Sequence, residues 1–128
     1  MSRCDLHIHS RHSARSEEWL FRRFDFPDSY SDPNQLYEQL RKRGMDYVTI
    51  TDHDSIDGCL EIANRPRTFI SEQVTTYFPN DACKLHILVW GISEQQHRDI
   101  ESVRENIFDL QRYLQRAQIA HAVAQFFY

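Results

Sequence analysis

The first residues of the chain alternate between apolar and polar side chains. In "RCDLHIHS", Leu6 and Ile8 alternate with Asp5, His7 and His9. A period of two is typical of a strand with one apolar face. We therefore expect a strand here, and we expect both histidines to lie on its other face.

Three segments show helical signals. In "DPNQLYEQLRKRG", apolar residues recur at helical spacing between Pro33 near the start and Gly44 at the stop, which predicts a helix. A short helix is expected over about residues 57 to 63. From Glu94 to about Gln118, apolar residues recur every three or four positions, which predicts one long amphipathic helix. These positions are Ile100, Val103, Ile107, Leu110 and Leu114.

Further strands are predicted by runs rich in β-branched and other apolar residues. "MDYVTITDHDSIDG" ends in polar residues, as expected of a buried strand that delivers groups at its C-terminal end. "RTFISEQVTTYF" and "KLHILVWGI" are two more strands, joined by the turn "PNDAC", and "IAHAVAQFFY" begins another. The stretch from Arg11 to Pro33 is predicted as a long loop with one short helix, whose aromatic residues either lid or wall a cleft.

The order of these elements predicts the fold class. Alternating strands and helices favour a largely parallel α/β sheet, either open or closed into a barrel. In such folds, binding groups collect at the carboxyl ends of the strands. The polar residues of the chain lie in or at the ends of predicted strands: His7, His9, Asp52, His53, Asp54, Glu72 and His86.

Composition and charge narrow the function classes. A length of 128 residues is typical of one domain, so we expect a single domain over residues 1–128. The net charge is −4 without a basic block, which argues against nucleic acid as the main partner. No apolar run reaches about 18 residues and no leader is readable. Cys4, Cys59 and Cys83 fit reduced thiols better than a disulfide frame or a zinc knuckle. We expect a cytoplasmic protein.

The pair His7 and His9 has the spacing of metal ligands. Two residues apart on a strand, their backbones lie about 6.6 Å apart on one face. Both imidazoles can therefore reach one cation at about 2.0–2.1 Å. Asp5 lies on the same face and could accept a hydrogen bond from a ligating imidazole, which fixes its tautomer. The alternative is an edge strand with solvated histidines.

Each of the other polar groups also has two interpretations. "TDHD" at residues 51–54 provides either metal-site residues or the cap of a helix. Glu72 is either a ligand or a polar residue on a half-exposed strand, and His86 is either a ligand or a buried core histidine. Because all of these groups meet at strand ends, the metal interpretation is favoured when they are taken together.

These motifs resemble a known family. "DLHIHS", "TDHD", the glutamate of "ISEQVTT" and the histidine of "LHILVWG" occur in the order found in the polymerase and histidinol phosphatase (PHP) superfamily of metal-dependent phosphoesterases. The resemblance covers the whole chain and is nearest to uncharacterised bacterial stand-alone members. It implies a distorted seven-stranded β/α barrel that binds two or three metals. Family members include histidinol-phosphate phosphatases, nucleotide phosphatases and domains of bacterial DNA polymerases.

The resemblance also implies roles for single residues. His7 and His9 would bind one metal, Glu72 would bridge it to another that His86 also holds, and His53 would bind a different metal. Asp52 and Glu72 are the candidate catalytic carboxylates, and Asp5 and Asp54 would support the ligands. One to three divalent ions, zinc, manganese or iron, are expected. Cations about 3.5–4 Å apart can clamp a phosphate and activate a water.

The chain departs from the family pattern at three places. Ala14 lies where a ligand aspartate or histidine is usual, with His12 or Glu17 as candidate substitutes. Gln125 replaces the histidine of the family's "AHP" segment, and His121 is a second candidate substitute. The terminal Asp-x-His pair of the family would come well after Tyr128.

These departures leave the function open between alternatives. On length, we expect an incomplete (β/α) barrel of the PHP type, with mostly parallel strands, too short to close alone. A homodimer or another chain could then cover its open edge. The leading hypothesis is a phosphoesterase acting on a small phosphorylated metabolite or nucleotide through metal-activated water. The rivals are a truncated or degenerate non-catalytic domain that retains metal or partner binding, and an amidohydrolase-like enzyme.

Overall fold

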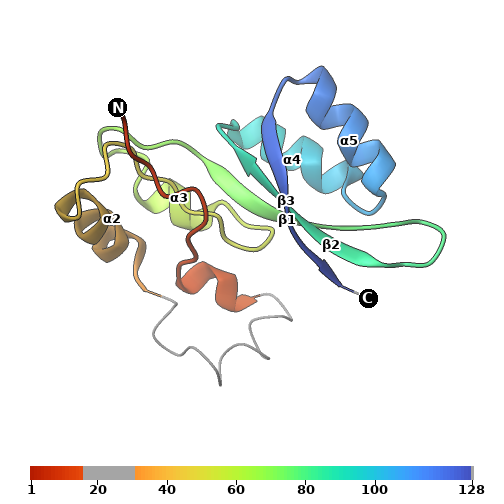
Figure 1. The fold of residues 1–128 in the computed structure, drawn as a ribbon, viewed down its shortest axis with the longest axis horizontal. Coiled ribbons are helices and arrows are strands. Elements are labelled where there is room, and N and C mark those ends of the chain that lie inside the picture. The colour runs from red at the N-terminus through yellow and green to blue at the C-terminus, as the bar shows by residue number, and fades with distance from the viewer. Residues whose placement is uncertain (16–30, 128) are drawn as a thin grey trace.

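The structure is a computed structural model that describes residues 1–15 and 31–127. The regular elements, in chain order, are η1 (Arg11–Arg15), α2 (Pro33–Lys42), α3 (Asp57–Glu61), β1 (Ser71–Tyr77), β2 (Lys84–Trp90), α4 (Glu94–Val103), α5 (Ile107–Arg116) and β3 (Ala120–Phe127). Helices α4 and α5 lie together on one side of the sheet, and α2 and α3 lie with the N-terminal segment (Figure 1).

The sheet has three strands in the order β1-β2-β3, and both pairs are antiparallel. The predicted barrel with mostly parallel strands is therefore wrong. Turn length gives the physical reason, because Phe78 N–H bonds Cys83 O at 3.0 Å across a short turn. Such a turn can join only antiparallel neighbours, whereas a parallel pair needs a crossover of about a dozen residues or more. The predicted turn at "PNDAC" is confirmed.

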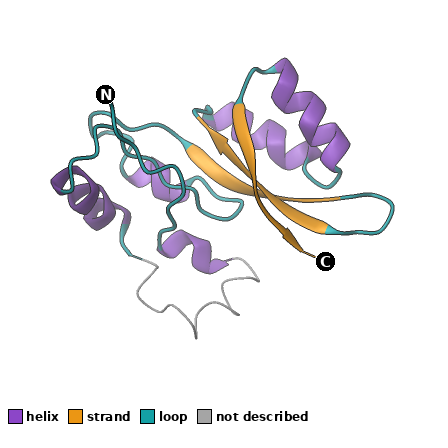
Figure 2. Ribbon diagram, in the orientation of Figure 1, coloured by secondary structure: helices purple, strands orange, loops and turns teal. Residues whose placement is uncertain are grey.

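The two N-terminal segments predicted as strands are largely loops (Figure 2). They touch other segments in parallel orientation only through isolated bridges, among them Cys4 with Tyr47, Val48 with Thr68 and His53 with Gln73. Parallel pairing therefore occurs among the described residues without extending into a ladder.

The predicted helices near Pro33 and Asp57 are confirmed. Asp32 caps α2 by accepting hydrogen bonds from the backbone N–H groups of Asn34 and Gln35, as expected for an N-cap aspartate. The long helix predicted from Glu94 is divided into α4 and α5. The division occurs because Asn106 is extended and its side chain caps α5 at Phe108 N.

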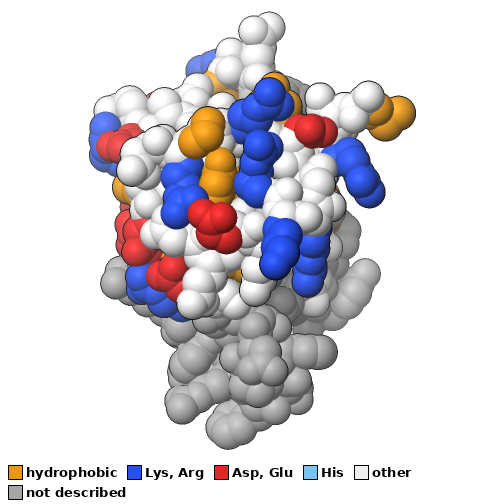
Figure 3. Space-filling model, turned by 90° about the vertical axis from the view of Figure 1, so that its left-hand side faces the viewer, with side chains coloured by type: hydrophobic (Ala, Val, Ile, Leu, Met, Phe, Trp, Pro, Cys, Tyr) orange, Lys and Arg blue, Asp and Glu red, His pale blue; other side chains and the backbone are white. Residues whose placement is uncertain are grey.

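Two apolar cores support these elements. The larger lies between the sheet and the helices α4 and α5, and includes Val74, Val89, Ile100 and Leu110. The smaller joins α2 and α3 to the segment that contains Val48 and Ile50. On the side of the molecule seen in Figure 3, basic and acidic side chains are interspersed and few hydrophobic ones show. No described helix has both the length and the apolar composition to cross a membrane.

Candidate histidine site

Four histidines from three distant segments lie in consecutive ring contact. The ring centroids are 5.1 Å apart for His7 and His9, 4.8 Å for His9 and His53, and 4.9 Å for His53 and His86. We call these four side chains the histidine row. His7 is exposed and His9 is half-buried, whereas His53 is 4% exposed and His86 is fully buried. The row therefore runs from the surface into the interior.

The N-terminal segment is fixed beside the row by Thr51. The backbone N–H of Thr51 donates to Ile8 O at 2.7 Å, and its hydroxyl oxygen lies 2.9 Å from Ile8 N and 3.0 Å from Ile8 O. The indole N–H of Trp90 also donates to Leu6 O at 2.9 Å. These bonds set the positions of His7 and His9, which flank Ile8.

Asp52 is linked to the row through Ser13, and its carboxylate binds hydroxyl and backbone groups. Its carboxylate accepts bonds from Ser10 N at 2.6 Å, Ser10 Oγ at 2.5 Å and Ser13 Oγ at 2.7 Å. Burial raises the pKa of Asp52, and the bonds from the two serines act in the opposite direction. Ser13 Oγ also lies 3.2 Å from His9 Nδ1 and 3.3 Å from His53 N. Asp52 thus supports the row through Ser13.

Gln73 lies between two histidines of the row and was missed by the sequence interpretation. Its Oε1 lies 2.8 Å from His7 Nε2, and its Nε2 lies 2.6 Å from His86 Nδ1. Gln73 is also 1% exposed. Strand alternation indicated only that Gln73 and its neighbour Glu72 face opposite sides of the strand, and not which of them faces the histidines.

Glu72 faces the helices and contacts a different histidine. Its Oε2 lies 2.6 Å from Nδ1 of His97 on α4, and His97 Nε2 lies 3.3 Å from Glu101. Burial raises the pKa of Glu72, and the bond to Glu72 is the main cause that raises the pKa of His97. Of the five side chains proposed as metal ligands, the structure brings four together in the row and directs Glu72 to His97.

The two aspartates expected to support the ligands bind backbone N–H groups, and Asp54 also binds a hydroxyl group. Asp5 Oδ1 accepts from the backbone N–H of His7 at 3.2 Å. Asp54, which has a positive φ of 51°, accepts from Thr75 N and Thr75 Oγ1, both at 2.6 Å. Asp54 therefore ties the loop after residue 53 to β1.

The candidate substitute residues lie apart from the row or outside the described part. His12 is paired with Glu61 on α3. His121 lies on β3, where its Nδ1 donates to Ile119 O at 2.8 Å. Ala14 is in η1, Gln125 is exposed and opposite His86 in the strand register, and Glu17 falls outside the described residues. The predicted aromatic loop also falls largely outside them.

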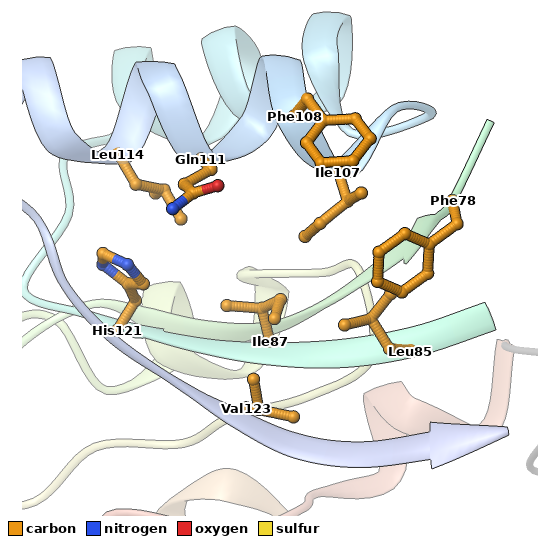
Figure 4. A pocket seen from close by; sticks show the side chains of 9 residues that line it. All are labelled: Phe78, Leu85, Ile87, Ile107, Phe108, Gln111, Leu114, His121 and Val123. Atoms are coloured by element: carbon orange, nitrogen blue, oxygen red, sulfur yellow. The ribbon is translucent and has the colours of Figure 1, made fainter. Parts of the chain in front are cut away.

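Two pockets border these elements. A polar pocket of about 460 Å³ touches the row at His53 and continues along α4 to His97, Glu101 and Arg104. An apolar pocket of about 290 Å³ lies between α5 and the sheet, lined mainly by aliphatic and phenyl side chains with His121 at its wall (Figure 4). The polar pocket is thus the one that adjoins the histidine row.

The described residues do not fit a resident metal ion. Within residues 1–15 and 31–127, no group of three or more His, Cys, Asp or Glu side chains is arranged to hold one. The rings of His9 and His53 are stacked with an interplanar angle of 7°. Imidazole binds metals through nitrogen lone pairs that lie in the ring plane, so stacked rings do not converge on one ion. The Glu72 carboxylate contacts His97 and therefore supplies no anionic ligand to the row.

Sequence comparisons match parts of longer proteins. No family model matches the chain. An uncharacterised protein of Methanocaldococcus jannaschii is 35% identical over 72 residues, covering 56% of this chain and 40% of that protein. A tRNA/tmRNA (uracil-C(5))-methyltransferase of Yersinia enterocolitica is 33% identical over 72 residues, covering 49% of this chain and 20% of that protein. The matched regions are therefore less than half of each relative.

Structure comparisons show the kind of fold. An amidohydrolase from Chromobacterium violaceum, solved with bound sulfate and no metal, superposes with a TM-score of 0.55 at 24% identity over 93% of this chain and 40% of that one. A putative metal-dependent phosphoesterase from Bifidobacterium adolescentis has a TM-score of 0.45 at 19% identity, over 91% and 38%. The chain shares its fold with part of the amidohydrolase.

Proposed function

We propose that the histidine row binds the phosphate group of a small phosphorylated molecule, in a degenerate domain of the metal-dependent hydrolase type. The observation that carries this proposal is the row itself, in which four imidazoles from three segments are held in contact at 4.8–5.1 Å. A protonated imidazole donates from both ring nitrogens, so one can bond an anionic oxygen, and His7 is the exposed member of the row, with His9 half-buried beside it. The PHP-like motifs support a phosphate ester as the ligand.

The comparison structure agrees with binding of an oxyanion in the absence of metal. The amidohydrolase that shares part of its fold with this chain was solved with bound sulfate and no metal, and sulfate has the tetrahedral shape and acceptor oxygens of phosphate. Because the described residues do not form a metal-binding group, we assign the row the role of binding the phosphate group itself. The chain's own residues would orient the ligand, with Ser13 and Asp52 holding His9 and His53 in place.

Metal-dependent phosphoester hydrolysis is the second candidate function. The same four imidazoles favour it, because imidazole is a ligand for zinc, manganese and iron. It would require the stacked pair His9 and His53 to separate. The two candidates differ in what added metal does to the protein.

The two candidates are tested by one set of measurements. Calorimetric titration with inorganic phosphate and with p-nitrophenyl phosphate should show binding to the wild type and a loss of about tenfold or more in His9→Ala. The matched control is His121→Ala, a histidine outside the row, which should bind as the wild type does. Phosphate binding that is equal in all three proteins would overturn the proposal. Manganese-dependent turnover that is lost in His9→Ala would establish the second candidate in its place.

A further inference from the structure

Gln73 makes two hydrogen bonds whose directions are set by its chemistry. An amide oxygen only accepts, and an amide NH₂ only donates. In this orientation of the amide, His7 Nε2 carries a proton and donates to Gln73 Oε1, and His86 Nδ1 accepts from Gln73 Nε2. An amide thus forces the two rings into opposite roles, whereas a carboxylate would accept from both.

The role of His86 decides whether its ring can bind a cation. A neutral imidazole carries one proton, so a ring that accepts at Nδ1 holds its proton on Nε2. Neither nitrogen then offers a lone pair to a metal. Metal-binding histidines usually show the reverse pattern, in which one ring N–H donates to a carboxylate or carbonyl and the other nitrogen binds the metal. His86 is fully buried, so water does not readily compete for this bond.

We propose that Gln73 sets the tautomers of His7 and His86 and, by leaving the His86 ring without a lone pair for a metal, keeps the histidine row from binding a divalent cation. The inference refines the proposed metal-free site and does not depend on phosphate binding. A carboxylate at position 73 would accept from His86 Nδ1 and present the Nε2 lone pair, and it would also add a negative charge beside His7. Adjacent Glu72 cannot take this role because its carboxylate lies with His97 on the other face of β1.

The tautomers can be measured directly in the wild type. Two-bond ¹⁵N–¹H correlation spectra of the ring nitrogens should show protonated Nε2 and unprotonated Nδ1 for His86, and protonated Nε2 for His7. The measurement needs neither metal nor phosphate, so its outcome is separate from that of the proposed function. A His86 ring protonated at Nδ1 in the wild type would overturn the inference.

Gln73→Glu tests the consequence for metal binding. In this variant His86 should change to the Nδ1-protonated tautomer. Titration with Co²⁺, followed by its visible absorption, and with Zn²⁺ should show binding about 10- to 100-fold tighter than in the wild type. Gln39→Glu, the same substitution at an exposed position of α2, should leave the metal affinity unchanged. Wild-type binding as tight as that of Gln73→Glu would contradict the inference, and the wild-type spectra decide it if the variant does not fold.

Discussion

Glu72 and Gln73 are neighbours on β1, and their side chains contact different histidines on opposite faces of the strand. Glu72 Oε2 lies 2.6 Å from His97 Nδ1, whereas the Gln73 amide is hydrogen-bonded to both His7 and His86. Because side chains alternate along a strand, only one of the two can face the histidine row. The neutral amide occupies that position, and the carboxylate stabilises the contact between β1 and α4.

Removal of His97 should destabilise the fold strongly. Glu72 is 1% exposed, so His97→Ala leaves a buried carboxylate without its partner, which costs about 3–5 kcal/mol. Urea unfolding at pH 7 measures the loss. Glu101→Gln removes the exposed partner of His97 and should cost at most about 1 kcal/mol. A loss below 1 kcal/mol in His97→Ala would show that the pair contributes little.

The same pair predicts a dependence of stability on pH. The bond to Glu72 raises the pKa of His97 from 6.5, and burial raises the pKa of Glu72 from 4.5. The folded state therefore binds more protons than the unfolded state at pH values between the ordinary pKa of each group and its raised pKa in the fold. The free energy of unfolding should fall as pH rises above 6.5 through the raised pKa of His97. Urea midpoints between pH 6 and 8.5 should show this fall in the wild type and a much smaller one in His97→Gln.

Gly58→Ala should disturb the support of the row. A Cβ at Gly58 would lie 2.6 Å from Asp52 Oδ2 and 2.8 Å from Ser10 Oγ, so this network must shift. Overpacking costs about 1–3 kcal/mol, which outweighs a helix-propensity gain of about 1 kcal/mol. Thermal or urea unfolding should therefore show a net loss. As a control, a Cβ at Gly91 would have no atom within 4 Å, and the φ of Gly91 is 69°. Any loss of stability in Gly91→Ala therefore reports backbone strain alone, without a steric clash. Wild-type stability of Gly58→Ala would contradict the geometry.

The members of the histidine row could be predicted because each belongs to a motif with a chemical reason. "HIH" gives two imidazoles on one face, and His53 and His86 follow or lie in runs of β-branched and apolar residues. The contacts of the row confirm that these residues meet. Their metal-binding role remains a prediction.

The contacts that could not be predicted depend on pairing between distant segments. In "SEQVTT", alternation alone does not say whether Glu72 or Gln73 faces the histidines. That choice follows from the register of β1 on β2, where Thr75 is opposite His86, and a one-residue slip would exchange the faces. The role of His97 was equally hidden, because it lies on a helix surface and its partner is 25 positions away. The predicted parallel sheet is wrong because the short turn between β1 and β2 can join only antiparallel strands.

Thr51→Val should loosen the segment that carries His7 and His9. The substitution keeps the shape of the side chain but removes the hydroxyl that bonds Ile8 N and Ile8 O. Leaving these backbone groups with fewer partners should cost about 1–3 kcal/mol in urea unfolding. Thr51→Ser retains the hydroxyl and should lose clearly less. Equal losses in both variants would mean that the methyl group, and not the hydroxyl, is what matters.

Asp54 offers a test of how the loop after His53 is fixed to β1. Asp54→Ala removes both bonds to Thr75 and leaves alanine at a φ of 51°, so the lost bonds and the backbone strain should together cost about 3 kcal/mol. Asp54→Asn keeps one acceptor, and asparagine tolerates positive φ, so it should cost only about 1 kcal/mol. In a double-mutant cycle, Thr75→Val should destabilise the wild type more than it destabilises Asp54→Ala, because its hydroxyl then has no carboxylate to bind. Additive losses would show that the loop is held by other contacts.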